Sequence, residues 1–343
     1  MKGNGINHAS QHQSAPRERP DHSSTAASSQ TALCRVPETL AALFEISRMH
    51  SAPQFSAGSQ SNYIADVDRF LDGIEMLPPS PYPLPQLLKA LGDPDTDLNK
   101  LVDIISLEPS LAAKLLQLCN SAFFSRGTPV NSVREAIHRL GLQTIYRVVA
   151  SIRGPRALGT ASRFTGVEAE DLWRHSVMTA FAAQFIAEDF GKESDLFFTA
   201  GLLHDLGKSI LAEAYKEKYA ALVATARRDR IPLHQLESAE FGIHHAAIGG
   251  RLLERWNFSV DLVSSVRFHH EPELAEQMDK FSAFIQVGSA FANIAFPARA
   301  GRPAFEAASG LRILRFSMED LNRYSERLQQ SMSFAKALLK IDH

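Results

Sequence analysis

The residues best suited to chemistry lie in the segment Gly201–Lys208, whose sequence is GLLHDLGK. A helix that presents His204 and Asp205 in succession places an imidazole and a carboxylate about 100° apart on one turn. Together they can hold one metal ion, or the carboxylate can bridge two. Gly207 costs about 1 kcal/mol of helix propensity, which indicates that another group approaches closely there. Lys208 lies on the face of His204, where its ammonium could meet a phosphate oxygen. The competing interpretation is a plain helix end, with His204 bonded to the backbone and Lys208 in solvent.

Four further histidines fall among apolar residues at helical spacing. His175 precedes the pair, His245 begins a segment in which Gly249 and Gly250 favour close packing, and His269–His270 end the next apolar segment. Each histidine taken singly is more often a satisfied structural residue, because burying an unpaired imidazole costs several kcal/mol. Their joint occurrence makes a metal centre an equal alternative to separate structural roles. The candidate metal ligands are His175, His204, Asp205, His245, His269 and His270, and the candidate catalytic residue is Lys208.

The elements that must position these residues are all helices. Apolar residues recur every three or four positions from Tyr63 onward, and no run alternates strictly between apolar and polar. Asp97 and Ser132 are expected to cap two short helices, and Ser317 with Asp320 resembles a capping box. The expected helices cover residues 84–91, 101–105, 111–119, 133–140, 172–190, 197–215, 245–256, 281–294 and 318–339. The pattern predicts an all-α fold.

Composition sets the organisation of the chain. Residues 1–62 are expected to form a disordered extension and linker. Residues 1–32 carry almost no large apolar side chains, a short helix is expected over 37–46, and residues 51–62 have the composition of a linker. Residues 63–300 are expected to form the main domain, and 301–343 a C-terminal helical extension. The last helix either closes the core or pairs with a partner, and core closure is favoured.

The charge balance and cysteine count exclude several classes of protein. The 36 Lys and Arg against 38 Asp and Glu give a net charge of -2, which argues against binding to a polyanion. Two cysteines cannot build a disulfide framework, and no segment approaches 18 consecutive apolar residues or resembles a secretion signal. We expect a cytoplasmic protein with no membrane span.

The motifs resemble the HDOD family, a branch of the HD superfamily of metal-dependent phosphohydrolases. The resemblance covers residues 77–275, with the HD-like half from about residue 171. It rests on motifs in a characteristic order: Ile105–Leu111, Leu118–Phe124, Ala136–Gly141, Trp173–Ser176, Ala200–Lys208, Glu240–Gly249, Trp256 and His269–His270. The resemblance implies a multi-helix HDOD fold, in which an N-terminal helical half packs on an HD-like helical half.

The departures from the HD pattern bear on activity. Catalytic HD enzymes hold a metal with a His, the His-Asp pair and a later Asp, which the resemblance carries onto His175, His204 and Asp205. The position of the later Asp falls on Ser289, whose neutral hydroxyl weakens that corner. The Gly-Tyr-Pro signature of related cyclic-di-GMP phosphodiesterases is missing, because Glu271 is followed by Pro272.

These features predict a bacterial regulatory module that acts through contacts with signalling proteins and keeps a residual metal or ligand pocket. The family implies regulation more often than turnover. The alternative is a metal-dependent phosphohydrolase acting on a phosphoester, nucleotide or cyclic dinucleotide. Nucleic-acid binding is disfavoured by the charge. The bound metal could be a divalent transition metal (Fe, Zn or Mn), and binding of no metal is also left open. Self-association is a further open alternative.

Overall fold

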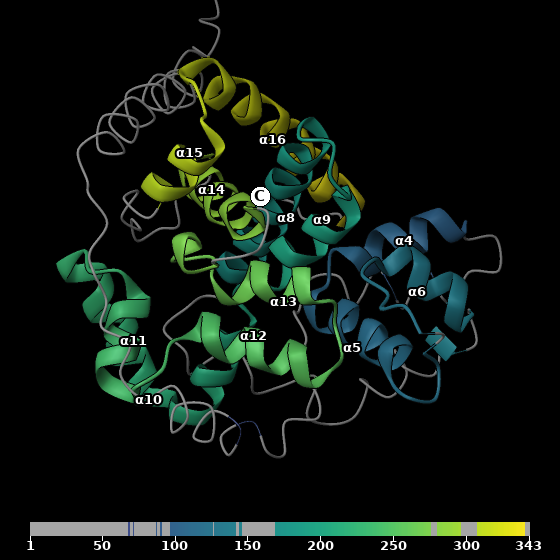
Figure 1. Cartoon of the computed structure of the whole chain (residues 1–343), viewed down its shortest axis with the longest axis horizontal. Coiled ribbons are helices and arrows are strands. Elements are labelled where there is room, and N and C mark those ends of the chain that lie inside the picture. The colour runs from purple at the N-terminus through teal and green to yellow at the C-terminus, as the bar shows by residue number, and fades with distance from the viewer. Residues whose placement is uncertain are drawn as a thin grey trace, which may run out of the picture. The chain divides into compact units, whose positions relative to one another are not determined.

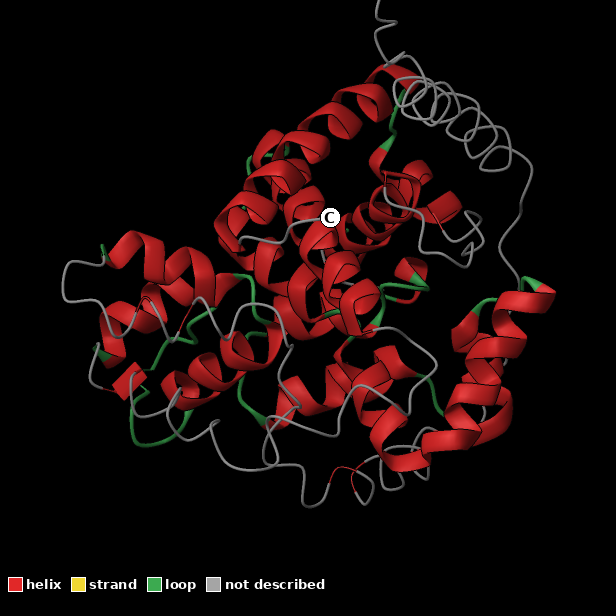
Figure 2. Ribbon diagram, turned by 180° about the vertical axis from the view of Figure 1, so that it is seen from behind, coloured by secondary structure: helices red, strands yellow, loops and turns green. Residues whose placement is uncertain are grey.

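The computed structural model describes residues 68, 71, 87, 90, 97–125, 127–141, 144–145, 169–275, 280–295 and 307–339. The chain divides into two units, Met1–Val36 and Pro37–His343, and every described residue belongs to the second. The described residues form helices joined by turns and contain no strand (Figures 1 and 2). The fold is all-α, as the sequence predicted. The expected disorder of residues 1–62 lies outside the described residues, and the boundaries at 63–300 and 301–343 stay predictions.

Three short helices, α4 (Leu98–Ser106), α5 (Pro109–Asn120) and α6 (Val133–Leu140), form the N-terminal half. Two of their ends are set by the expected capping residues. Asp97 accepts a hydrogen bond from the Asn99 amide at 3.2 Å, and Ser132 accepts one from the Glu135 amide at 3.2 Å. These bonds satisfy amides that would otherwise lack a partner at a helix start.

The HD-like half is built around α8 (Ala169–Asp189), which packs against α9 (Ser194–Leu203) and α14 (Phe281–Ala295). Small residues permit these close contacts. A Cβ atom at Gly201 of α9 would lie 2.7 Å from the Ala180 Cα of α8. A Cβ at Gly288 of α14 would lie 3.2 Å from the backbone amide of Ala183. The helix that carries His175 is therefore held on two sides by backbone approach.

Side-chain hydrogen bonds join the described parts of the two halves. The indole nitrogen of Trp173 donates to the Leu107 carbonyl at 2.6 Å, and the Thr199 hydroxyl donates to the Asn131 carbonyl at 2.7 Å. Helix α5 also packs against α9. The N-terminal half therefore packs on the HD-like half, as the family resemblance implied.

The segment expected to form one helix over 197–215 forms two. Helix α9 ends at Leu203, and α10 (Leu206–Asp229) begins after His204 and Asp205. The reason is local, because the His204 side chain bonds the Gly201 carbonyl at 2.7 Å. In a continuous helix that carbonyl would accept from the Asp205 amide. The predicted end near residue 215 coincides with a kink in α10, where Lys216 has a φ of 36°.

Helices α11 (Leu233–Phe241), α12 (His245–Arg255) and α13 (Val260–Arg267) follow, and the 3-10 turn η1 (Pro272–Leu274) leads toward α14. The C-terminal helices are α15 (Ala308–Leu314) and α16 (Met318–Leu339). The expected capping box is present, since the Ser317 amide donates to Asp320 at 2.9 Å and the Asp320 amide donates to the Ser317 hydroxyl at 3.2 Å. Tyr324, Leu328 and Met332 are buried where α16 packs on α8 and α14, which favours core closure.

Candidate metal centre

All six candidate ligands come together in one largely buried cluster of side chains, which we call the pocket. His175 projects from α8, His204 and Asp205 lie at the turn between α9 and α10, and His245 is the first residue of α12. His269 and His270 follow α13 directly. Five of the six are buried, and His270 is half-buried. They divide into two groups, His175–His204–Asp205 and His245–His269–His270, in each of which the candidate ligand atoms lie within 4.8 Å of one another.

In the first group, the two histidines lie beside the carboxylate oxygens of Asp205. The Nε2 atoms of His175 and His204 are 3.2 Å apart. Asp205 Oδ1 lies 3.4 Å from His204 Nε2, and Asp205 Oδ2 lies 3.6 Å from His175 Nε2. The Ser289 hydroxyl of α14 lies 3.2 Å from His175 Nε2. Ser289 thus occupies the edge of this group, at the position where the family resemblance led us to expect an aspartate.

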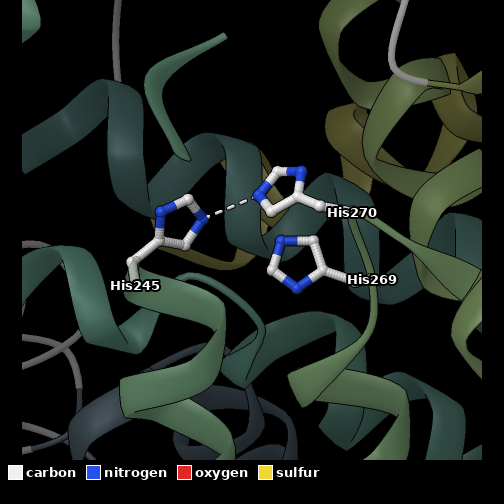
Figure 3. A group of neighbouring side chains, drawn as sticks. All are labelled: His245, His269 and His270. Carbon is white, nitrogen blue, oxygen red and sulfur yellow. Dashed lines mark hydrogen bonds between the residues drawn. The ribbon is translucent and has the colours of Figure 1, made fainter. Parts of the chain in front are cut away.

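The second group is shown in Figure 3, where the three imidazoles face one another. His270 Nε2 lies 2.9 Å from His245 Nε2. His245 Nε2 also lies 3.3 Å from Asp205 Oδ1, so the same carboxylate contacts both groups. This is the arrangement in which one carboxylate could bridge two ions.

The imidazoles are oriented by hydrogen bonds to their other ring nitrogens. Nδ1 of His204 faces the Gly201 carbonyl and Nδ1 of His269 faces the Val266 carbonyl, each at 2.7 Å. A carbonyl oxygen can only accept, so each Nδ1 must carry the proton and a neutral ring turns its Nε2 lone pair into the pocket. Such outer hydrogen bonds are typical of metal-bound histidines.

The donor set fits a metal ion. With its Nδ1 protonated, neutral His204 presents a lone pair to the Asp205 oxygen at 3.4 Å, a contact that a cation between them would make favourable. His269 Nε2 is buried and makes no hydrogen bond within the described part of the chain. Desolvating such an atom without a partner is costly. The two groups could therefore hold a metal.

Lys208 lies inside the pocket and not in solvent. It is 6% exposed, and its Nζ donates to Asp205 Oδ2 at 2.7 Å. The interpretation of the segment as a plain helix end is thus right for the His204 backbone bond and wrong for Lys208. A close approach was expected at Gly207, and the group that approaches is the backbone carbonyl of His245. A Cβ atom at Gly207 would overlap this carbonyl.

The pocket shifts the protonation of its members. Burial lowers the pKa of His204 to about 4. Burial alone would raise the pKa of the Asp205 carboxyl, but the neighbouring His204, Lys208 and His245 hold it well below its usual range. Burial also opposes protonation of His245, yet the carboxylates of Glu237 and Asp205 raise its pKa. Asp205 is therefore an anion at neutral pH, as a metal ligand must be.

Sequence reasoning missed three residues beside the pocket. Glu237, on α11, accepts hydrogen bonds from the His245 backbone amide at 2.9 Å and from His245 Nδ1 at 2.6 Å. The His234 ring of α11 stacks on His270 with ring centroids 4.1 Å apart, and His244 lies beside both. A polar segment with few apolar residues gave no helical pattern, so only the spacing of His234 and Glu237 before His245 could have drawn attention to them.

Comparison with known proteins identifies the class to which this fold and pocket belong. The family model of the HDOD domain matches residues 77–272, more than half of the chain. The chain therefore belongs to the HDOD domain family. Helices α14, α15 and α16, and with them Ser289, lie beyond the matched residues.

Two known proteins are similar to part of this chain. An uncharacterized protein of Treponema pallidum is 29% identical over 238 residues, which are 68% of this chain and 45% of that protein. Ribonuclease Y of Petrotoga mobilis is 24% identical over 217 residues, which are 62% of this chain and 32% of that protein. The chain thus spans less than half the length of these two relatives.

Two crystal structures share the fold. The MmoQ response regulator of Methylococcus capsulatus superposes with a TM-score of 0.60 at 22% identity, covering 74% of this chain and 99% of that one. A virulence factor of Campylobacter jejuni superposes with a TM-score of 0.60 at 23% identity, covering 75% of this chain and 95% of that one.

Among the described residues, no helix combines the length and the apolar character needed to cross a bilayer.

Proposed function

We propose that this chain is a bacterial signalling module whose histidine pocket binds a divalent transition metal, and that it acts through contacts with signalling proteins in the cytoplasm. The observation that carries the proposal is the pairing of a converged histidine pocket with Ser289 at its edge, 3.2 Å from His175. The pocket keeps the donors that retain an ion. It has a neutral hydroxyl in place of the anionic ligand that the family resemblance led us to expect, which favours binding over turnover.

The donor chemistry supports zinc, iron or manganese over magnesium. Imidazoles outnumber carboxylates in both groups, and imidazole suits transition metals while magnesium prefers oxygen ligands. When bound, such an ion would act as a Lewis acid and lower the pKa of a coordinated water. The protein's own residues hold Asp205 as an anion and aim the imidazole Nε2 atoms inward.

A second candidate function, metal-dependent phosphoester hydrolysis, is favoured by Lys208. Its buried ammonium lies beside Asp205, where it could offset the charge of a phosphoryl group. The relative from Petrotoga mobilis is a ribonuclease by name, which makes phosphodiesters the first substrates to test. Against this candidate stand Ser289 and, for a nucleic-acid substrate, the net charge of -2.

Metal analysis tests the proposed binding. Protein purified without chelators is expected to contain one or two transition-metal ions per chain by plasma mass spectrometry. His204→Ala should lose most of the metal, because it removes a ligand from the buried group. His138→Ala, at an exposed position of α6, is the matched control and should keep wild-type content. Wild-type protein that carries no metal, and takes up none on dialysis, would overturn the proposal.

Activity assays separate the two candidate functions. Phosphomonoesters, phosphodiesters and cyclic dinucleotides are incubated with metal-loaded wild type and with His204→Ala. The regulatory proposal predicts equal background rates for both proteins. Turnover by the wild type that disappears in His204→Ala and follows metal content would establish the hydrolase instead.

A further inference from the structure

Glu237 is a fully buried carboxylate with every hydrogen bond directed at the pocket or at its support. It is 0% exposed, and both of its carboxylate oxygens accept hydrogen bonds. Oε2 accepts from the His245 backbone amide and from His245 Nδ1, and Oε1 accepts from the Tyr219 hydroxyl at 2.7 Å. Burying a charge is costly unless it is paired and fully hydrogen-bonded, so this carboxylate needs an explanation beyond packing.

The bonds of Glu237 determine what His245 presents to the pocket. Both oxygens of Glu237 accept from the Tyr219 hydroxyl and the His245 backbone amide, so the remaining contact at 2.6 Å also needs a donor, and His245 Nδ1 carries the proton. The opposite ring nitrogen, Nε2, is then aimed at Asp205 Oδ1 (3.3 Å) and His270 Nε2 (2.9 Å). The additional bond to the backbone amide ties the first residue of α12 to α11. A single carboxylate thus fixes the position, the rotation and the tautomer of this imidazole.

His245 differs in this respect from the other two oriented histidines. His204 and His269 donate from Nδ1 to neutral backbone carbonyls, whereas His245 donates to a charged group at 2.6 Å. A charge-assisted hydrogen bond is about twice as strong as a neutral one, and it raises the basicity of the opposite nitrogen. His245 is therefore expected to be the strongest nitrogen donor among the three.

We propose that Glu237 is a positioning residue of the metal centre, which with Tyr219 holds His245 so that its Nε2 binds the ion shared with Asp205. The inference rests on the proposed metal-binding function. It assigns α11, which contributes none of the six candidate ligands, a direct part in metal affinity. The relay Tyr219–Glu237–His245 joins α10, α11 and α12 through side chains that are all buried.

The test uses Glu237→Gln in the full chain, with Co²⁺ as the probe. Glutamine keeps the shape, and its oxygen can still accept from His245, while its amide can donate to Tyr219 if the hydroxyl rotates; only the charge is lost. We expect the dissociation constant for Co²⁺, followed by its visible absorption, to rise about 10- to 100-fold. The metal-free variant should still unfold cooperatively, with a lower thermal midpoint, because glutamine keeps the hydrogen bonds but loses the charge that faces His245.

Two further variants complete the design. Glu240→Gln lies on the same helix and loses only an exposed ion pair with Lys218 at 2.6 Å, so its Co²⁺ affinity should equal that of the wild type. Tyr219→Phe removes one hydrogen bond to Glu237 and should weaken Co²⁺ binding a few-fold. If Glu237→Gln fails to fold, Tyr219→Phe provides the test. A dissociation constant for Co²⁺ equal to that of the wild type in Tyr219→Phe would then count against the relay.

The outcomes separate the two proposals. If the wild type binds no Co²⁺, the proposed function fails and the role of Glu237 fails with it. If the wild type binds Co²⁺ and Glu237→Gln binds it with the same affinity and the same spectrum, only the positioning role is overturned. A weaker Co²⁺ affinity in a Glu237→Gln variant that is still fully folded at the assay temperature supports the role and excludes a purely structural carboxylate.

Discussion

At the scale of single residues, the pocket is defined by how its charges are balanced in the absence of an ion. Asp205 is 1% exposed, and the Lys208 ammonium donates to its Oδ2 at 2.7 Å. Burial lowers the pKa of His204 to about 4, so this neighbour is neutral at pH 7, whereas Glu237 and Asp205 raise the pKa of His245 against the effect of burial. Lys208 therefore supplies positive charge that a metal ion would otherwise bring.

This balance predicts the behaviour of Lys208→Met. Breaking a buried ion pair from one side costs about 3–5 kcal/mol, so metal-free Lys208→Met should be destabilised by that amount in urea unfolding. Added Zn²⁺ should recover much of the loss, because the ion replaces the missing charge beside Asp205. Lys218→Met, which breaks an exposed pair with Glu240 and a cation–π contact with Phe241 at 5.4 Å, should change the unfolding free energy by about 1 kcal/mol or less. Equal stability of the two metal-free variants would contradict this account.

A second residue-scale prediction concerns pH. Burial lowers the pKa of His204 and His244 to about 4 and that of His234 to about 3. Between about pH 6.5 and 4 the unfolded chain therefore binds protons that the folded chain refuses. The stabilisation is complete above pH 6.5 and is lost as the pH falls, by about 1.4 kcal/mol per pH unit for each such proton. His245 acts in the opposite direction, because its pKa is raised and its contribution is lost as the pH rises.

Urea unfolding of metal-free protein at pH 7 and pH 5 checks the net effect. We expect a lower free energy of unfolding at pH 5. Three described histidines, His204, His234 and His244, have lowered pKa values, and they outweigh His245, whose pKa is raised. His234→Asn should make the difference between the two pH values smaller. An unchanged or higher free energy at pH 5 would show that the buried histidines accept protons without cost.

How far the pocket could be predicted from sequence differs between its parts. The six candidate ligands lie in motifs with recognisable neighbours, such as the apolar run before His204, so their meeting could be expected. Glu237 lies in the segment LHQLESAEF, where glutamate on a short polar helix is indistinguishable from a solvated residue. Only the fold, which brings α11 against the start of α12, turns it into a buried partner of His245.

At the scale of elements, glycines decide which helices can meet at the pocket. Gly207 was expected to mark a close approach from its cost in a helix, and the approaching group is the His245 carbonyl. Gly250 of α12 has the same role, since a Cβ there would lie 2.6 Å from the Arg267 Cβ. Gly249 was expected to behave likewise, but its nearest neighbour, the Val266 Cγ1, is at an ordinary 3.4 Å. Sequence cannot separate such neighbours, because the difference depends on how α12 is rotated against α13.

The contrast between Gly207, which is in close contact, and Gly249, which has ordinary spacing, gives a matched pair of variants. Gly207→Ala would push α12 away from α10, and overpacking of this kind costs about 1–3 kcal/mol or more. It should also weaken metal binding, because the displaced residue is His245. Gly249→Ala should be neutral or stabilising by up to about 1 kcal/mol, from improved helix propensity alone. Thermal melts of both variants, with and without Zn²⁺, check the pair, and equal losses in both would refute the packing argument.

At the scale of the whole molecule, the pocket is connected to helices outside the matched family region. Gln286 of α14 donates to the His270 carbonyl at 2.9 Å, and its Oε1 accepts from the Gly310 amide of α15 at 2.7 Å. The Ser309 hydroxyl donates to the same oxygen at 3.0 Å. One amide side chain therefore ties the backbone that carries His270 to the start of α15. The all-α class was predictable from the spacing of apolar residues, but this cross-link was not, because Gln286 lies inside an apolar helix with no sequence neighbour that reveals its partners.

The cross-link predicts a specific effect of Gln286→Leu. Leucine fills similar space but leaves the Gly310 amide and the His270 carbonyl without this partner, and each buried unsatisfied group costs about 1–3 kcal/mol. Amide hydrogen exchange should therefore accelerate in peptides that cover residues 307–317 and 268–274, while peptides from α5 keep wild-type protection. Gln330→Leu, at an exposed position of α16, is the control and should leave exchange unchanged in both regions. If Gln286→Leu accelerates exchange in α15 but not around His270, the amide supports only the C-terminal helices, and the pocket is held by α13 and α14 without it.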